Sequence, residues 1–269
     1  CTNHTGGNVS PPESLDWAMS TQTAGPLAGK RALVTGGSRG IGAAIVRRLV
    51  ADGADVAFTY NSSPDHAEKV VAETVIGGAK VAAIQADSAD AEAVAAAVDD
   101  AAAQLGGLDI LVNNAGVASF GGVEDYPLAE FDRLVAINVR GVYAAIQKAV
   151  PHLGQGGRII TIGSVNAEWV PVTGLAVYAM TKAAVAGLTR AVARELGPRG
   201  ITVNNIQPGP VATDLNPDEG EFADSIRSFS ALGHYGETSD IASAVAYLAL
   251  PEARFITGVN WNVDGGVTL

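Results

Sequence analysis

The stretch Thr35-Gly36-Gly37-Ser38-Arg39-Gly40-Ile41-Gly42 follows a short apolar run at 31–35 and opens a helical pattern over 40–51. Glycines at such a turn let the chain bend tightly, and they let a pyrophosphate approach the amides at the positive end of the helix. The spacing is Gly-x3-Gly-x-Gly, not the more common Gly-x-Gly-x-x-Gly. A strand-to-helix turn in any α/β protein could carry such glycines, but the position after the first strand favours a phosphate-binding loop.

Outward from this loop, the chain alternates short apolar runs with helical stretches. The apolar runs are nearly continuous, which is typical of parallel strands buried on both faces. Such alternation predicts an α/β, doubly wound sheet that binds ligands at the carboxyl ends of its strands. The predicted strands are 31–35, 55–60, 80–85, 108–113, 158–163, 201–206 and 259–263, and the predicted helices are 40–51, 64–76, 89–105, about 127–153, about 174–196 and 239–250.

The composition limits the class of protein. Of the 269 residues, 48% are hydrophobic and 17% are charged, so we expect a large core and one domain over 27–269. The formal net charge of −11 argues against nucleic acid or an anionic membrane as a partner. A single cysteine excludes an intrachain disulfide and fits the cytoplasm, and no metal site is expected because the four histidines have no paired ligands.

The first 26 residues differ in character from the rest. They are polar, contain Asn, Gly, Pro and Ser, and show no hydrophobic period; Met19 lies within them. We interpret 1–26 as a disordered leader or a vector-derived segment, with a native start at Met19.

The end of the second predicted strand bears on the choice of cofactor. An acid there would bind the ribose hydroxyls of NAD, but the run Phe58-Thr59-Tyr60-Asn61-Ser62-Ser63 has none. Hydroxyls, an amide and the nearby Arg39 suit a 2′-phosphate, which favours NADPH. The same Asn-Ser-Ser run also fits a cap for the helix that begins near Pro64, and it can serve both purposes.

The run Tyr178-Ala-Met-Thr-Lys182 carries the catalytic signal. Residues i and i+4 share one helix face, so we expect the Lys182 ammonium to lie near the phenol and to lower the pKa of Tyr178. A phenol with a lowered pKa is a usable general acid near neutral pH. Ser164 lies at the end of a predicted strand, 14 positions earlier, and strand ends face the ligand crevice. Alone, the Tyr-x3-Lys pair would also fit a surface pair.

Three further motifs follow predicted strands or lie inside a helix. Asn113-Asn114-Ala115-Gly116 ends the fourth strand, and Pro208-Gly209-Pro210 with Thr213 follows the sixth, where a loop could meet a nicotinamide amide. Asn138 lies inside a helix, where asparagine is unfavourable. Either Asn138 marks a local bend, or its backbone holds a water in a proton relay.

Together with Val263-Asp264-Gly265-Gly266, these motifs resemble the short-chain dehydrogenase/reductase family, most of all its 3-oxoacyl-carrier-protein reductase-like subgroup, from about Leu27 to Leu269. The resemblance implies a three-layer Rossmann fold of seven parallel strands and a homotetramer. It implies Tyr178 as acid/base, Lys182 on the nicotinamide ribose, Ser164 orienting the carbonyl, Asn138 holding a relay water and Asp87 near the adenine. The predicted cofactor contacts are Gly36, Ser38, Arg39, Gly40, Ile41, Gly42, Tyr60, Asn61, Ser62, Asp87, Ser88, Asn114, Ala115, Gly116, Tyr178, Lys182, Pro208, Gly209, Val211 and Thr213.

A narrower resemblance gives an alternative function. Ile162-Gly163-Ser164-Val165-Asn166 and the run from Gln207 to Pro217 are similar to reductase-like proteins associated with biofilm dispersal and cyclic di-GMP binding. The alternative is therefore a nucleotide-binding regulatory protein on a reductase scaffold. The intact catalytic set favours NADPH-dependent reduction of a ketone, aldehyde or 3-oxoacyl carbonyl.

The substrate is specified only weakly by the sequence. The loop over 214–236 is expected to cover the site, and it mixes apolar side chains with acids that include Asp218, Glu219, Glu221 and Asp224. An acidic lid disfavours an anionic carrier-protein substrate, so we expect a small neutral ketone or aldehyde. Trp169 either lines the pocket or packs at an interface.

The two long predicted helices carry more apolar residues than one core-facing stripe requires. Val139, Val142, Tyr143, Ile146 and Val150 lie on one, and Val185, Leu188, Ala191 and Val192 on the other. Either a partner subunit or other helices of the same chain cover the second face. A second subunit contact is expected near Trp261.

Overall fold

The computed structural model describes residues 25–74 and 78–269; the predicted leader lies, up to residue 24, outside the described residues. The predicted α/β architecture is confirmed. Seven parallel strands form one sheet in the order β3-β2-β1-β4-β5-β6-β7. The strands are β1 (Arg31–Val34), β2 (Asp55–Tyr60), β3 (Val81–Gln85), β4 (Ile110–Asn113), β5 (Arg158–Ile162), β6 (Thr202–Pro208) and β7 (Asn260–Val263).

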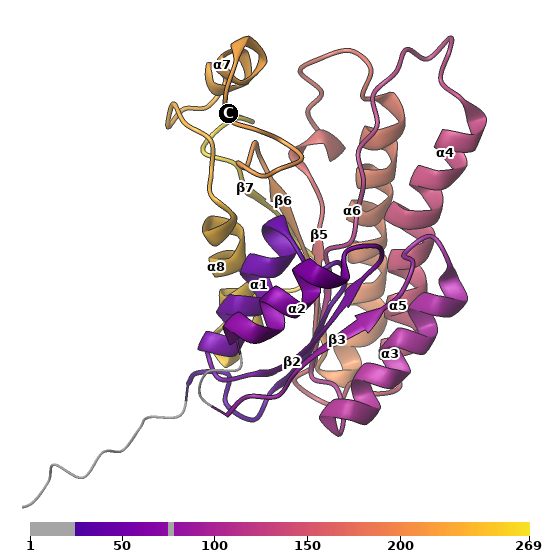
Figure 1. Ribbon diagram of the computed structural model, residues 1–269, viewed down its shortest axis with the longest axis vertical. Helices are drawn as coiled ribbons and strands as arrows, with labels where there is room; N and C mark the ends of the chain where they lie inside the picture. Colours follow the sequence, from indigo (N-terminus) through magenta and orange to yellow (C-terminus); the bar gives the residue numbers. More distant parts are fainter. Residues whose placement is uncertain (1–24, 75–77) are drawn as a thin grey trace, which may run out of the picture.

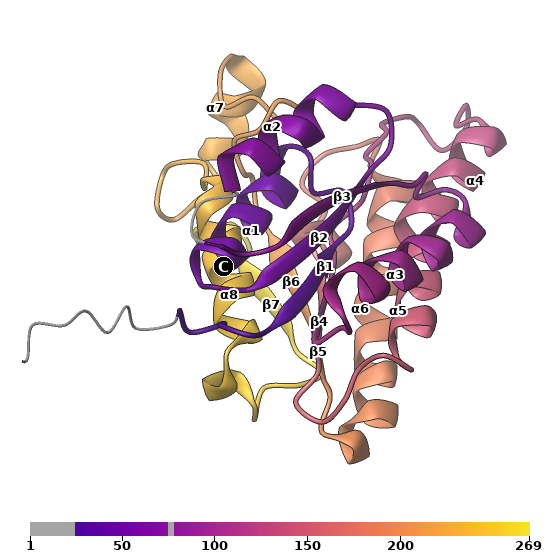
Figure 2. The ribbon, with the colours of Figure 1, turned by 60° about the horizontal axis from the view of Figure 1, so that its bottom comes forward.

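Helices cover both faces of the sheet and make three layers (Figures 1 and 2). One face packs against α1 (Gly40–Ala51), α2 (Pro64–Thr74) and α8 (Thr238–Ala249), and the other against α3 (Ala91–Leu105), α5 (Val142–Ala149) and α6 (Ala176–Leu196). Two separate apolar cores result, one on each side of the sheet. The near-continuous apolar runs of the inner strands follow from this arrangement, because both sides of these strands meet a helix layer, whereas the edge strands β3 and β7 are more exposed. Among the described residues, no helix is both long enough and apolar enough to cross a membrane.

The strand order reverses between β1 and β4. From β1 the chain winds outward to β2 and β3, and it then returns to β4 and winds the other way. The loops after β1 and β4 therefore diverge and leave a crevice at the carboxyl ends of the strands. The glycine loop follows β1 and Asn114 follows β4, so the topology brings these two motifs together.

Two helical segments differ from the expected pattern. The predicted helix over about 127–153 divides into α4 (Leu128–Val135), a π-helical segment at Ala136–Gly141 and α5. The segment over 214–236, predicted as a loop, contains the short helix α7 (Glu221–Arg227). Short 3-10 turns lie at Val165–Ala167, Gly197–Arg199 and Pro251–Ala253.

Candidate active site

The glycine loop after β1 has a conformation that needs glycine. Gly36 has φ +67°, and a Cβ there would lie 3.0 Å from the Ala115 Cα. A Cβ on Gly42 would lie 2.1 Å from the Gly36 carbonyl oxygen. The loop and the first turn of α1 thus pack too closely for a side chain at either position.

The Asn113–Gly116 motif holds this loop in place. Asn114 donates hydrogen bonds from Nδ2 to the Thr35 and Gly36 carbonyl oxygens at 3.0 and 2.9 Å. The Thr35 hydroxyl accepts in return from the backbone amides of Asn114 and Ala115, at 3.0 Å each. The Gly36 amide donates to the Thr59 hydroxyl at 3.0 Å. Residues in or directly after the neighbouring strands β1, β2 and β4 therefore hold the glycine loop in place.

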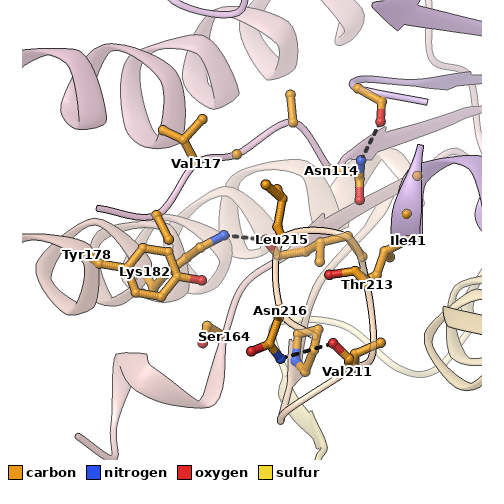
Figure 3. A pocket seen from close by; sticks show the side chains of 18 of the residues that line it. Ile41, Asn114, Val117, Ser164, Tyr178, Lys182, Val211, Thr213, Leu215 and Asn216 are labelled. Atoms are coloured by element: carbon orange, nitrogen blue, oxygen red, sulfur yellow. Dashed lines mark hydrogen bonds between the residues drawn. The ribbon is translucent and has the colours of Figure 1, made fainter. Parts of the chain in front are cut away.

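A cleft of about 520 Å³ runs along the carboxyl ends of the strands. It contains every site residue predicted from the sequence except Asn138. In Figure 3, Tyr178, Lys182 and Ser164 lie at one end of the pocket, and Ile41 and Thr213 lie toward the other. The predicted cofactor contacts on the lining are Gly36, Ser38, Arg39, Gly40, Ile41, Gly42, Tyr60, Asn61, Ser62, Asp87, Ser88, Asn114, Ala115, Gly116, Pro208, Gly209, Val211 and Thr213, together with Tyr178 and Lys182.

The glycine-loop end of the cleft fits a dinucleotide that carries an extra phosphate. Arg39 is the N-cap residue of α1, and its side chain makes no capping hydrogen bond to the described residues. The first turn of α1 has no acid, so the positive end of the helix faces the cleft without a compensating charge. Hydroxyls and an amide from Tyr60, Asn61, Ser62 and Ser63 line the same end. This set of donors suits phosphate oxygens.

Tyr178 and Lys182 lie one turn apart on α6, as predicted. The Lys182 Nζ lies 5.6 Å from the centroid of the Tyr178 ring, and it donates a hydrogen bond to the Ile162 carbonyl oxygen at 3.0 Å. Ile162 is the last residue of β5, and Ser164 follows two residues later. The β5 end and the first turns of α6 therefore bring the three side chains together.

The expected lowering of the Tyr178 pKa is wrong for the protein without a ligand. Burial raises the pKa of Tyr178, and a hydrogen bond with Ser164 offsets only part of that rise. Burial also lowers the pKa of Lys182 to about 8, from an ordinary value of 10.5. Removing both groups from water disfavours their charged forms, and the ammonium over the ring does not compensate. The phenol thus stays protonated at neutral pH.

Asn138 lies behind the cleft, in the π-helical segment, and it is buried. Its Nδ2 donates to the Val117 carbonyl oxygen at 2.8 Å and to the Thr181 hydroxyl at 3.1 Å. Its Oδ1 accepts from the Val117 amide at 2.9 Å. The side chain thus joins the loop after β4 to α6, the helix that carries Tyr178 and Lys182.

Asn166 also lines the cleft, although no motif in the sequence assigns it a separate role. The Ser164 Oγ donates to the Asn166 Oδ1 at 3.2 Å and accepts from the Asn166 amide at 3.1 Å. The Asn166 Nδ2 donates to the Trp169 carbonyl oxygen at 3.0 Å. Asn166 therefore fixes the direction of the Ser164 hydroxyl. Its position two residues after a cleft-facing serine is the signal that could have found it.

The end of the cleft beyond Ser164 and Tyr178 is mainly apolar. Trp169 lines it, as one of the two interpretations expected, and its ring also meets Phe229 edge-on with centroids 5.4 Å apart. Asp214 lines the cleft, whereas the four lid acids Asp218, Glu219, Glu221 and Asp224 do not. The cleft is also lined by Phe120, Leu175 and Leu215. These residues belong to no motif, and the one signal for them in the sequence is their position in the segments that follow strands. No cluster of His, Cys, Asp and Glu suited to a metal occurs in 25–74 and 78–269.

The chain is similar in sequence and structure to known reductases and dehydrogenases. A family model described as enoyl-(acyl carrier protein) reductase matches residues 36–268. The chain is 47% identical to the cyclic-di-GMP-binding biofilm dispersal mediator protein of Escherichia coli, over 90% of this chain and 98% of that protein. It is 41% identical to the 3-oxoacyl-[acyl-carrier-protein] reductase of Staphylococcus aureus, over 88% and 98%. A crystal structure of a short chain dehydrogenase from Burkholderia cenocepacia in complex with NADP is 52% identical, with a TM-score of 0.89 over 91% of this chain and all of that one.

Proposed function

The chain belongs to the short-chain dehydrogenase/reductase family, and from this premise we propose that it reduces a ketone, aldehyde or 3-oxoacyl carbonyl to an alcohol with NADPH. The observation that carries the proposal is one cleft with Ser164, Tyr178 and Lys182 at one end and Arg39 with the glycine loop at the other. The coarser conclusion, an oxidoreductase of this family, follows from the family itself.

The cofactor end supports NADPH in particular. Arg39 and the hydroxyl-bearing run from Tyr60 to Ser63 would hold the 2′-phosphate, and the open first turn of α1 would hold the pyrophosphate. Lys182 would bind the nicotinamide ribose, and Asp87 would lie near the adenine. The NADP complex of the Burkholderia relative supports the same choice. When bound, NADPH supplies a hydride to the carbonyl carbon of the substrate.

Tyr178 serves as the general acid in this proposal. Its pKa is raised by burial, so the phenol keeps its proton at neutral pH and can give it to the oxygen of the developing alcohol. Ser164, whose Oγ accepts from the Asn166 amide, would turn its one hydroxyl proton from the Asn166 Oδ1 to the same oxygen and so orient the carbonyl. The reverse reaction, oxidation of the alcohol, would need the phenolate as base.

Asn138 and Lys182 complete the proposed proton path. Lys182 is buried, and its ammonium already has the Ile162 carbonyl as one acceptor. The backbone carbonyl of Asn138 holds a relay water in this proposal, while its side chain keeps the loop after β4 against α6. Asn138 contacts α6 through the Thr181 hydroxyl, and Lys182 is the next residue of that helix.

The direct test of the function is NADPH oxidation against a panel of ketones, aldehydes and 3-oxoacyl thioesters, with NADH in parallel. Carbonyl-dependent oxidation of NADPH, at least about tenfold better than that of NADH, is the expected result. A protein that binds NADPH but oxidises it with none of these carbonyls would contradict the proposal.

A second candidate function, binding of cyclic di-GMP, is favoured by the E. coli relative alone. A dianionic cyclic dinucleotide needs cations, and among the described residues that line the cleft these are Arg39 and Lys182. Any cyclic di-GMP that binds in the cleft should therefore compete with NADPH. Calorimetry of cyclic di-GMP with and without saturating NADPH tests this: tight binding without turnover of any carbonyl would favour the sensing function.

We also propose the homotetramer and the cytoplasmic location that the sequence predicts. Val142, Ile146, Val185 and Val192 are buried within the chain, so the same chain covers part of the long helices. An outward hollow between α4–α5 and α6 remains, which a partner subunit would cover; Val135, Val139, Tyr143, Leu188 and Ala191 line it. Light scattering should give about four chain masses, and an active monomer would overturn the tetramer.

A further inference from the structure

The substrate end of the cleft is built by three segments that lie far apart in the sequence. The loop after β4 contributes Phe120, the loop before α6 contributes Trp169 and Val172, and the lid contributes Leu215, Phe222 and Ile226. The first two segments are joined by a hydrogen bond from the Gly121 amide to the Gly174 carbonyl oxygen at 3.0 Å. The second and third meet at the edge-on contact of Trp169 with Phe229. These contacts hold the apolar walls together.

Two residues of these walls have large aromatic side chains that are mostly exposed to solvent. Phe120 is 63% exposed and Phe222 is 57% exposed, although both line the cleft. Neither ring belongs to one of the two cores of the sheet. An apolar group that enters the cleft would remove their surface from water, and burial of such surface is the main favourable term in binding apolar ligands.

Charge at this end does not suit an anionic substrate. Among the described residues that line the cleft, Arg39 and Asp87 are predicted cofactor contacts and Lys182 belongs to the predicted catalytic set; the remaining charged residue, Asp214, is an acid from the lid. The nearest lid cation, Arg227, is already bound to the Asp224 carboxylate and the Asp218 carbonyl oxygen, and it lies over the Tyr235 ring. A phosphate- or carboxylate-bearing substrate would therefore find repulsion here and no free guanidinium.

The hydroxyls of the cleft are linked to its aromatic residues. Ser164 and Tyr178 supply hydroxyls, and Asn166 joins Ser164 to Trp169 by hydrogen bonds, while Phe120 and Phe222 line the same cleft. We propose that the substrate is an uncharged ketone that bears an aromatic ring next to its carbonyl, with Phe120 and Phe222 as the residues that select the ring. This inference rests on the proposed reductase function and narrows its substrate class.

The test compares three carbonyl probes with NADPH: 1-phenylpropane-1,2-dione, 2,3-butanedione and acetoacetyl-CoA. The first two differ by one phenyl in place of one methyl, and the third is anionic. We expect kcat/KM for the phenyl dione to exceed that for butanedione by about 10- to 100-fold, which is the effect of burying one ring. Acetoacetyl-CoA should be the poorest of the three.

Variants assign the effect to the two rings. Phe120→Ala and Phe222→Ala should each reduce the phenyl-to-methyl ratio about fivefold, mainly through KM. Phe255→Ala is the matched control, because Phe255 is 97% exposed and lies outside the cleft. Equal kcat/KM for the two diones in the unaltered protein, or preference for acetoacetyl-CoA, would overturn the inference and leave carbonyl reduction intact. Failure to reduce any carbonyl would instead overturn the reductase function and this inference with it.

Discussion

Asn138 binds the backbone of Val117 through both ends of its side-chain amide, donating to the carbonyl oxygen at 2.8 Å and accepting from the amide at 2.9 Å. A third hydrogen bond reaches the Thr181 hydroxyl, one residue before Lys182. The asparagine that propensity disfavours inside a helix is thus the residue that joins the loop after β4 to α6. The helix is π-helical where Asn138 occurs.

The first prediction concerns this clamp. Asn138→Ala removes three hydrogen bonds and leaves the Val117 backbone groups without their partner, so we expect a loss of about 2–4 kcal/mol of stability. Thermal unfolding of the cofactor-free protein measures it. Asn61→Ala, at an exposed position, is the control. A melting temperature for Asn138→Ala within a degree of the unaltered protein would show that the clamp is unimportant.

The second prediction concerns cofactor choice. Arg39→Ala should raise the Kd for NADPH about 10- to 100-fold, because one charge-assisted contact contributes about 1.5–3 kcal/mol, and it should barely change the Kd for NADH. Arg47, on the same helix, is bound to Glu73 and does not line the cleft, so Arg47→Ala is the matched control. Fluorescence titration with both cofactors measures the effect. Equal affinity of the unaltered protein for NADPH and NADH would refute the choice.

The third prediction concerns pH. The pKa of Lys182 in the folded protein is about 8, below the ordinary 10.5, so the folded state holds fewer protons than the unfolded chain between those values. Stability should therefore rise with pH across that interval. From pH 7 to 9.5, the cofactor-free protein should gain about 2 kcal/mol relative to Lys182→Met.

Melting temperatures over this pH range measure the difference between the two proteins, which should reach roughly 4–8 °C. Lys80→Met, at an exposed lysine, should follow the unaltered protein. Parallel pH curves for Lys182→Met and the unaltered protein would contradict the shifted pKa.

The fourth prediction concerns Asn166. Asn166→Ala frees the Ser164 hydroxyl to rotate, so we expect kcat to fall about tenfold or more with little change in NADPH affinity, because only the orientation of the carbonyl is affected. Asn166→Asp keeps an acceptor for the Ser164 proton and should recover part of the loss. Steady-state kinetics on one substrate measures both variants. A loss of kcat that is equally large in Asn166→Asp, with a changed Kd for NADPH, would indicate a general structural role instead.

Much of the fold was predictable because most strands are apolar runs and several motifs follow strand ends. Gly36, Asn114 and Ser164 lie where parallel strands end, and parallel strand ends share one edge of a sheet. The proximity of Tyr178 and Lys182 was predictable from helical spacing, whereas their place in the site was predictable only together with Ser164 and the other motifs. These features depend on local sequence, and the structure places all of them on one cleft.

The features that sequence reasoning missed depend on contacts between distant segments. Burial of the phenol sets the direction of the Tyr178 pKa shift. The spacing of residues along a helix does not show how deeply a side chain is buried. The helix α7 is short and lies in an acidic segment without a clear apolar period. Phe120 has no motif, and only the folded chain places it on the cleft with Phe222 from the lid.

The central claim is that Tyr178 gives its proton to the carbonyl oxygen during reduction by NADPH. Tyr178→Phe keeps the ring and its packing but removes that proton. The most direct measurement is the single-turnover rate of NADPH oxidation by this variant on a substrate that the unaltered protein reduces, with the Kd for NADPH determined in parallel. For Tyr178→Phe we expect a Kd for NADPH that is unchanged within about twofold and a single-turnover rate that is reduced by at least about 100-fold. A variant that binds NADPH normally and turns over at close to the unaltered rate would contradict it.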